Sequence, residues 1–234
     1  MKLKRLDEAR AALERAIELL PEHAVVGANY AYACSETGSL EEGLRALRRA
    51  VALAPHVVDV QHQMPYLMNY SDGVTRDEVF EEHVRFAHML GGRVAGELGE
   101  PALAVPGPGD AERTLRVGLL SADFREHSVA RYLEAILREH DPARVRYTLY
   151  PCSSEADETT ARLKGWAEEW STAALGPELA AAAAIRRDRI DILIDLAGHT
   201  TGNRLPVMQG GPAPLQGTYL GYPNTTGMST VHFR

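Results

Sequence analysis

Three short segments of this chain concentrate residue types that could do chemistry. They are SADFREHS (residues 121–128), AGHTTGNR (197–204) and LGYPNTTG (220–227). Each one follows an apolar run and is rich in glycine, threonine, asparagine or histidine, as loops that bind ligands often are. A histidine in such a loop could accept a proton or act as a neutral hydrogen-bond partner, because its pKa lies near neutrality. Hydroxyls and backbone N–H groups could receive an anion.

Each candidate also has a plainer interpretation. His127 could be a base, or it could cap the helix that it opens or lie on the surface. His199 could take part in catalysis or be a turn residue beside Gly198. Asp123 could bind a ligand or cap its own loop, and the Thr-Thr-Gly stretch at 225–227 could bind an anion or form an ordinary turn.

The apolar runs before these loops predict a parallel sheet. Strands are expected at 115–121, 145–150, 190–196 and 215–220, and helices at 128–140, 157–170 and 177–188. Strands that alternate with helices form βαβ units, and the loops after parallel strands meet at the carboxyl edge of the sheet. About four strands are fewer than a complete doubly wound domain contains. We therefore expect a partial, Rossmann-like lobe over 113–234, with its functional face at that edge.

The first part of the chain repeats itself with a period of 34 residues. LDEARAALERAIELLP (6–21) aligns with LEEGLRALRRAVALAP (40–55), and eight of the sixteen residues are identical. The segment between them, AVVGANYAYACSETG, is typical of a partner helix that ends at Gly38. This helix–turn–helix period resembles the tetratricopeptide repeat. We expect such repeats over 1–70, beginning within the second helix of a repeat.

The repeats then lose their signature. Helices are expected at 57–70 and 75–90, and the segment PALAVPGPGD (101–110) is typical of a linker. We therefore predict a helical linker and a Pro/Gly-rich connector over 71–112.

Composition excludes several classes of function. A net charge of −7 argues against a nucleic-acid partner, which needs a basic face. The N-terminus has no apolar signal segment, and the longest uncharged apolar run, 179–185, is too short to span a membrane. The two cysteines are far apart, and His62, His83 and His88 form no H-E-x-x-H motif. The sequence thus predicts a cytoplasmic protein without a membrane partner, a metal site or another cofactor.

Together, the motifs resemble the O-linked N-acetylglucosamine transferase family, including its SPINDLY-type members. LRVGLLSADFREHSVARYL, DRIDILIDLAGHTTGNRLPV and GPAPLQGTYLGYPNTTG follow the repeats in the family's order. The resemblance implies a repeat superhelix joined to a two-lobed glycosyltransferase of the GT-B type. The family moves a sugar from a nucleotide sugar to a Ser or Thr hydroxyl of a protein, with inversion and without a metal. Such a reaction needs a group that accepts the hydroxyl proton and a cation that stabilises the departing diphosphate.

The resemblance assigns roles to residues of all three segments. The histidine of the family's D-F-x-x-H segment, put forward as a base, corresponds to His127. The residues expected to line the cleft near the sugar and the acceptor are His199, Thr200, Asn203, Arg204, Leu220, Gly221, Tyr222, Pro223 and Thr225. His62 falls in the linking helices, where the family has another cleft histidine, although the local match is weak. The implied donor is UDP-N-acetylglucosamine or GDP-fucose, and protein or peptide acceptors are expected in the repeat groove.

The chain also departs from the family pattern. Ser128 stands where proline is frequent, Asn224 replaces a usual glycine, GGPAP (210–214) replaces a basic R-x-P-A-P, and HFR (232–234) replaces D-Y-R. The sequence ends within the first lobe, and we identify no diphosphate cradle in it. We therefore expect the N-terminal half of a protein O-glycosyltransferase that is inactive alone. The alternative is a non-catalytic tetratricopeptide interaction module, a truncated or degenerate relative.

Overall fold

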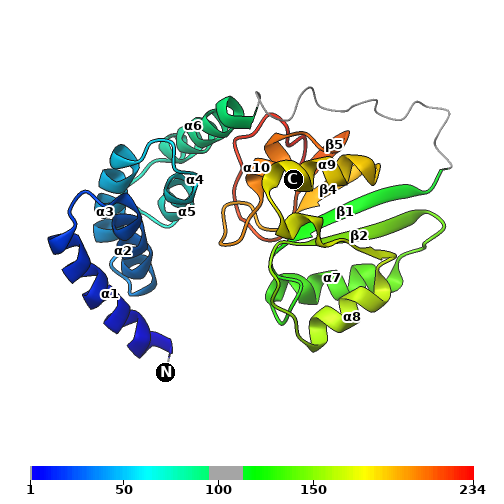
Figure 1. Cartoon of the computed structure of the whole chain (residues 1–234), viewed down its shortest axis with the longest axis horizontal. Coiled ribbons are helices and arrows are strands. Elements are labelled where there is room, and N and C mark those ends of the chain that lie inside the picture. Colours follow the sequence, from blue (N-terminus) through cyan, green and yellow to red (C-terminus); the bar gives the residue numbers. More distant parts are fainter. Residues whose placement is uncertain (1, 95–112) are drawn as a thin grey trace. The chain divides into compact units, whose positions relative to one another are not determined.

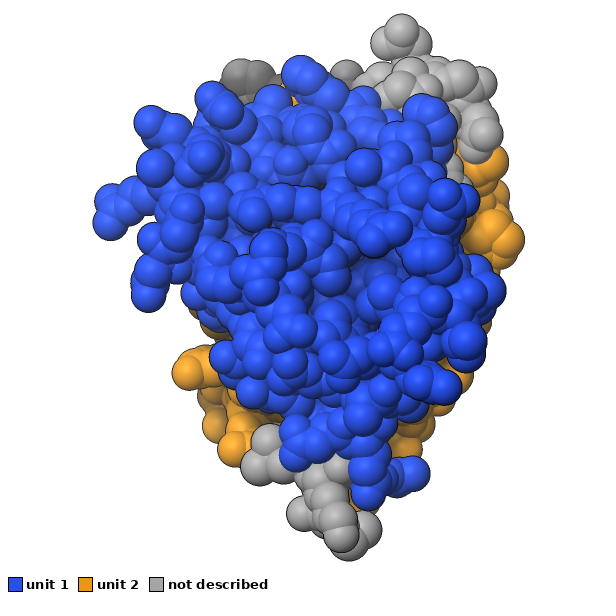
Figure 2. All heavy atoms as spheres, turned by 90° about the vertical axis from the view of Figure 1, so that its left-hand side faces the viewer, with its two compact units in different colours: residues 1–89 blue, residues 90–234 orange. Residues whose placement is uncertain are grey.

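The chain divides into two compact units, Met1–Met89 and Leu90–Arg234 (Figure 2). The computed structural model describes residues 2–94 and 113–234. The connector predicted at 101–110 lies outside the described residues, as does part of the linker predicted over 71–112. Each unit has a hydrophobic core of its own.

The first unit is built from helices (Figure 1). The helices up to residue 94 are α1 (Lys2–Leu19), α2 (Ala24–Glu36), α3 (Leu40–Leu53), α4 (Val58–Gln61), α5 (Gln63–Met68) and α6 (Arg76–Val94). α1 and α3 carry the two aligned segments of the repeat, and α2 packs against both of them. The predicted helix–turn–helix repeat is therefore confirmed in α1 to α3.

Gly38 ends α2 as predicted. Its φ of +80° lies in the left-handed region, which favours glycine. The N–H of Ser39 donates to the carbonyl of Cys34 at 2.8 Å, and the N–H of Gly38 donates to that of Ser35 at 3.3 Å. This pair of bonds is the Schellman arrangement, and it satisfies the last carbonyls of α2 while the chain reverses into α3.

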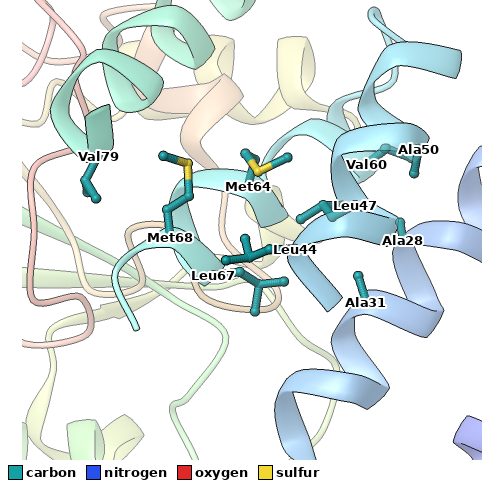
Figure 3. Packing of buried hydrophobic residues seen from close by; sticks show 10 residues of the cluster. All are labelled: Ala28, Ala31, Leu44, Leu47, Ala50, Val60, Met64, Leu67, Met68 and Val79. Atoms are coloured by element: carbon teal, nitrogen blue, oxygen red, sulfur yellow. The ribbon is translucent and has the colours of Figure 1, made fainter. Parts of the chain in front are cut away.

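Small residues let α2 and α3 approach each other closely. A Cβ added to Gly43 would lie 2.7 Å from the backbone oxygen of Ala31, and one added to Gly27 would lie 3.2 Å from the Cβ of Ala50. The core of the unit forms around this contact (Figure 3). Its buried side chains are Ala28, Ala31, Leu44, Leu47, Ala50, Val60, Met64, Leu67, Met68 and Val79.

The helix predicted over 57–70 is divided into α4 and α5. Pro65 lies inside α5 and has no N–H for the carbonyl four residues earlier, so one continuous helix would lose a hydrogen bond there. Close to the break, the buried Gln61 side chain donates to the backbone oxygens of Val51 and Ala54 at 3.1 and 3.0 Å. These hydrogen bonds hold the break between α4 and α5 against the end of α3.

The second unit contains a parallel sheet with the strand order β3-β2-β1-β4-β5. The strands are β1 (Leu115–Ser121), β2 (Val145–Pro151), β3 (Glu169–Trp170), β4 (Ile192–Asp195) and β5 (Leu215–Thr218), the last two shorter than predicted. The helices are α7 (Ser128–Glu139), α8 (Glu158–Trp166), α9 (Glu178–Arg187) and α10 (Leu205–Gln209), with a short 3-10 helix at Thr172–Leu175. α7 and α8 lie together on one side of the sheet, and α9 and α10 lie together on the other (Figure 1). The predicted α/β architecture is confirmed.

The strand order reverses at β1. From β1 the chain steps outward to β2 and β3, and it then returns to place β4 and β5 on the other side of β1. The connections therefore diverge at the carboxyl ends of β1 and β4. In open parallel sheets, ligands bind at such a switch point.

The helix predicted over 157–170 is too long. α8 ends at Trp166, and residues 169–170 form the edge strand β3 beside β2. The ring of Trp170 packs against that of Phe124 with 5.7 Å between their centroids. A contact with a residue so distant in the chain leaves no trace in local periodicity, which is why the sequence pattern extends the helix.

Replacing Gly43 with alanine is expected to destabilise the first unit. The added Cβ would meet the Ala31 backbone at 2.7 Å. Overpacking costs about 1–3 kcal/mol, which exceeds the roughly 1 kcal/mol that alanine gains in helix propensity. Thermal unfolding measured by circular dichroism should show a lower Tm. The matched control is Gly165→Ala in α8, where a Cβ meets nothing within 4 Å. A Gly43→Ala protein at least as stable as that control would contradict the close contact.

Candidate functional site

The three segments predicted to do chemistry meet at the carboxyl edge of the sheet. We call them the first loop (121–128, after β1), the second loop (197–204, after β4) and the third loop (220–227, after β5). In the parallel register Leu120 pairs with Asp195, and Asp195 pairs with Thr218. The three loops therefore begin side by side, as the sequence predicted.

The first loop is fastened to the start of α8. The N–H of Glu126 donates to Oδ2 of Asp157 at 2.6 Å, and Oγ1 of Thr160 donates to the carbonyl of Phe124 at 2.6 Å. Asp157 and Thr160 also form the capping box of α8, so the same two side chains fix both the helix and the loop. His127, which follows this anchored backbone, is thereby held in a defined place.

His127 has two polar neighbours, and both face the same nitrogen. Its Nδ1 accepts the N–H of Val129 at 3.3 Å as the N-cap of α7, and Oδ2 of Asp123 lies 3.7 Å from Nδ1. When Nδ1 accepts the helix N–H, the proton of the neutral ring must be on Nε2. When Nδ1 carries the proton and faces Asp123, Nε2 has a free lone pair and can accept a proton. The imidazole is 39% exposed, so Nε2 is within reach of a ligand in the second tautomer.

Polar side chains of the second loop shape the loop itself. Oγ1 of Thr200 donates to the carbonyl of Ala197 at 2.8 Å. The side chain of Asn203 donates to the carbonyl of Thr200 at 2.9 Å and accepts the N–H of Leu205 at 3.2 Å. His199 is only 1% exposed. These residues lie at the predicted edge, where they determine the shape of the loop.

Two glycines let the second and third loops pack closely against each other. Gly198 has a φ of +57°, and a Cβ added to it would collide with the side chain of Tyr222. A Cβ added to Gly221 would collide with the backbone oxygen of Leu196. The rings of Tyr222 and His199 are also in contact, with 5.2 Å between their centroids. Because the glycines lack side chains, the two loops can form one continuous wall.

The remainder of the third loop is a self-contained turn. Oγ1 of Thr225 accepts the N–H of Gly227 at 3.0 Å, and Oδ1 of Asn224 accepts the N–H of Thr225 at 2.7 Å. These N–H groups already have acceptors, which favours the turn interpretation of 225–227 over the anion site. The exposed residues of the loop's first half are Leu220, whose φ is +64°, and Pro223.

Asp195 is a buried carboxyl at the end of β4. Its Oδ2 accepts the N–H of Gly198 at 2.6 Å, and the residue is 1% exposed. Burial raises the pKa of Asp195 to about 7, although the N–H groups of Gly198 and Ala197 oppose the shift. The carboxyl therefore changes its protonation state near neutral pH.

Cys152 follows β2 and lies among the charges of this edge. Burial is the main reason that its pKa is raised to about 12. The carboxylates of Asp195 and Asp123 raise that pKa further, whereas the guanidinium of Arg204 lowers it. A thiol with so high a pKa is a poor nucleophile at neutral pH. The backbone carbonyl of Arg204 accepts the N–H groups of Val207 and Met208. Its guanidinium makes no hydrogen bond or ion pair with any residue that the structure describes, which leaves the cation available to a ligand.

The sequence motifs single out neither Asp195 nor Cys152. The available signal is their position, because Asp195 lies within the strand predicted at 190–196 and Cys152 comes two residues after the one predicted at 145–150. The carboxyl ends of parallel strands meet, so such positions are near any ligand.

His62 lies in the first unit, at the break between α4 and α5. Its Nδ1 is 3.3 Å from the backbone oxygen of Val58. Burial lowers the pKa of His62 and outweighs that contact, so the imidazole is neutral at pH 7.

The described residues, 2–94 and 113–234, bear on two kinds of partner, metal ions and membranes. No group of three or more His, Cys, Asp or Glu side chains there is placed to hold a metal ion. Within the same ranges, every helix is too short or too polar to cross a membrane.

Comparison with known proteins gives matches in both units. The family model described as glycosyl transferase family 41 matches residues 98–233, and a tetratricopeptide repeat model matches residues 1–62. A probable UDP-N-acetylglucosamine–peptide N-acetylglucosaminyltransferase SPINDLY of Oryza sativa subsp. japonica is 34% identical over 68% of this chain and 18% of its own length. The protein of the same name from Arabidopsis thaliana is 40% identical over 53% of this chain and 14% of its own length.

A solved structure matches nearly the whole chain. The K341M mutant of Thermobaculum terrenum O-GlcNAc transferase superposes with a TM-score of 0.88 at 29% identity, over 97% of this chain and 42% of that one. The chain spans less than a fifth of the length of the two SPINDLY relatives.

The buried carboxyl of Asp195 predicts a pH dependence of stability. Its pKa of about 7 lies above the ordinary 3.8, so stability from the protonated form is fully present below about pH 4 and is lost as the pH rises through 7. Relative to Asp195→Asn, which cannot ionise, the native chain should lose on the order of 4 kcal/mol over this range. Urea unfolding at several pH values measures the difference. A difference between the two proteins that stays constant from pH 4 to 8 would contradict the burial of an ionisable carboxyl.

Proposed function

The chain belongs to glycosyl transferase family 41, and from this premise we propose that it supplies one lobe of a protein O-glycosyltransferase. In this proposal a sugar passes from a nucleotide sugar to a Ser or Thr hydroxyl of a protein. The names of the relatives, which are peptide N-acetylglucosaminyltransferases that use UDP-N-acetylglucosamine, support that compound as the donor. GDP-fucose is the alternative donor.

The position of His127 is the observation that carries the proposal. The residue follows β1, where the sheet connections diverge and ligands bind in open parallel sheets. Its backbone is anchored to α8, and its imidazole is partly exposed at that edge. A general base needs this combination of a fixed backbone and an accessible nitrogen.

We propose that His127 accepts the proton of the acceptor hydroxyl. The hydroxyl oxygen forms a bond to the anomeric carbon from the side opposite the nucleotide, which inverts that carbon. The bond to the diphosphate oxygen breaks, and the diphosphate leaves with the electron pair. The hydroxyl proton moves to Nε2 of His127, while Nδ1–H faces Asp123. In this scheme no metal takes part.

The other two loops would bind the sugar and the acceptor. Arg204 offers a guanidinium without a described partner, and Leu220 and Pro223 offer exposed apolar surface. The remaining predicted cleft residues would act through the shape of the wall, because they are buried or bonded within the loops. They are His199, Thr200, Asn203, Gly221, Tyr222 and Thr225.

We further propose that a second lobe of GT-B type binds the donor nucleotide, so that these 234 residues alone transfer no sugar. Two facts support this view: the chain covers 18% of the rice relative and 42% of the Thermobaculum structure. The tetratricopeptide match at residues 1–62 supports protein acceptors that bind along the repeats.

A transfer assay tests the proposal. The chain is assayed by itself and joined to the second lobe of a family 41 relative, with UDP-N-acetylglucosamine or GDP-fucose and an acceptor protein. We expect transfer only by the joined protein. If neither donor is transferred and neither nucleotide shifts the Tm of the joined protein, the catalytic proposal fails and the repeat-based interaction module takes its place.

His127→Asn separates the two roles of this histidine. Asparagine is a strong N-cap, so α7 should stay intact and the Tm should change little. Because asparagine accepts no proton, turnover of the joined protein should fall by about a hundredfold or more. His88→Ala, which changes an exposed histidine of α6, is the matched control and should retain full activity. A His127→Asn protein with native turnover would reduce His127 to a helix cap.

A further inference from the structure

Asp195 is a carboxylic acid at the end of an otherwise aliphatic, central strand. β4 is a central strand between β1 and β5, and its other residues are Ile192, Leu193 and Ile194. Oδ1 of Asp195 is buried and has no hydrogen-bond partner among the described residues, and no ion pair to the carboxyl is found within the same part of the chain. A buried carboxyl without a cation is costly, so its contribution to stability does not account for it.

The hydrogen bond of Asp195 determines the turn that opens the second loop. Its Oδ2 is the acceptor for the N–H of Gly198, at 2.6 Å. Gly198 is the residue whose left-handed backbone lies against Tyr222. Leu196, the next residue after Asp195, supplies the oxygen against which Gly221 packs. Both of these close contacts to the third loop therefore lie within three residues of Asp195.

We infer that Asp195 is a positioning residue: its carboxyl fixes the Gly198 turn, and through Tyr222 it fixes the third loop as well. It touches neither sugar nor acceptor, because it is buried beneath the turn. The inference rests on the proposed function in one respect only: it assumes that the second and third loops bind the sugar and the acceptor.

The groups around the carboxyl explain how its protonation affects the turn. The N–H groups of Ala197 and Gly198 face it from the second loop, and both favour the charged form. Cys152, after β2, also interacts with it electrostatically, and the same thiol interacts with Asp123 and Arg204. The carboxylate is a stronger acceptor than the acid, so the bond to Gly198 tightens as the pH rises through neutrality.

Amide hydrogen exchange tests the inference without any catalysis. In Asp195→Ala the Gly198 N–H loses its acceptor, and its exchange should accelerate by about tenfold or more relative to the amide of Leu119 in β1. In Asp195→Asn the amide oxygen can still accept, so the rate should stay within about threefold of the native rate. An Asp195→Ala protein with native Gly198 protection would overturn the inference.

Asp191→Asn is the matched control, because Asp191 directly precedes β4 and Asp195 ends it. Asp191 accepts two hydrogen bonds from Arg113 at 2.7 Å each, so its replacement should lower the Tm. The Gly198 amide should keep its exchange rate relative to Leu119. An equal acceleration in the control would show that any loss of stability loosens the turn, and that outcome would overturn the specific role of Asp195.

A titration of the native chain covers the case in which Asp195→Ala does not fold. The amide proton of Gly198 should shift downfield in NMR spectra with a midpoint near pH 7, and Asp195→Asn should lack that step. A native Gly198 amide whose shift has the same pH profile as in Asp195→Asn would contradict the inference, because its acceptor would then not be the Asp195 carboxyl.

Activity of the joined protein then separates this inference from the proposed function. Asp195→Ala should lower kcat/KM by about tenfold or more, and Asp195→Asn should restore most of it. If Asp195→Asn keeps the Gly198 amide protected but is as inactive as Asp195→Ala, the carboxyl has a chemical role and the positioning role is refuted. If the unmutated joined protein transfers no sugar, the proposed function fails, while the exchange and titration data still decide the role of Asp195 in the turn.

Discussion

The pairing of β1 with β2 on one side and β4 on the other is the constraint on which the candidate site depends. All these strands are parallel, so their carboxyl ends lie at one edge, and the chain must cross to opposite faces of the sheet on the two sides of β1. The connections diverge at the point where the first and second loops begin. His127 is functional in this account because of that topology, since nothing else in its immediate sequence distinguishes a base from a helix cap.

The second and third loops form the other wall of the site, and two glycines make their close packing possible. Gly198 lies against the side chain of Tyr222, and Gly221 lies against the backbone of Leu196; side chains at these two positions would prevent both contacts. The polar atoms of this wall are used mainly to hold its shape, as in the turn around Thr225 and the bond from Gly198 to Asp195. In the proposed reaction, such a wall would help to align the acceptor hydroxyl with the bond that breaks. His127 is partly exposed at this edge, and two hydrogen bonds to the start of α8 hold the loop before it.

Features that depend on local sequence could be predicted, and features that depend on long-range contacts could not. The repeat period, the end of α2 at Gly38 and the strand at 115–121 each have a local signal, and the structure has all three. β3 arises from the packing of Trp170 against a loop far away in the chain, so periodicity extends α8 through it. The role of Asp195 depends on burial between neighbouring strands, which a single sequence does not record. The family resemblance identifies His127 as the candidate base. Its tautomer matters because both Val129 N–H and Asp123 lie next to Nδ1.

The most direct test of the account is a crystal structure of the chain joined to a second lobe, with an acceptor peptide and an unreactive analogue of the donor bound. The proposed mechanism predicts that Nε2 of His127 lies about 3 Å from the acceptor hydroxyl, with the second and third loops against the sugar. It would be contradicted if the hydroxyl faced another proton acceptor and the His127 imidazole remained turned toward the N–H of Val129 with no contact to either substrate.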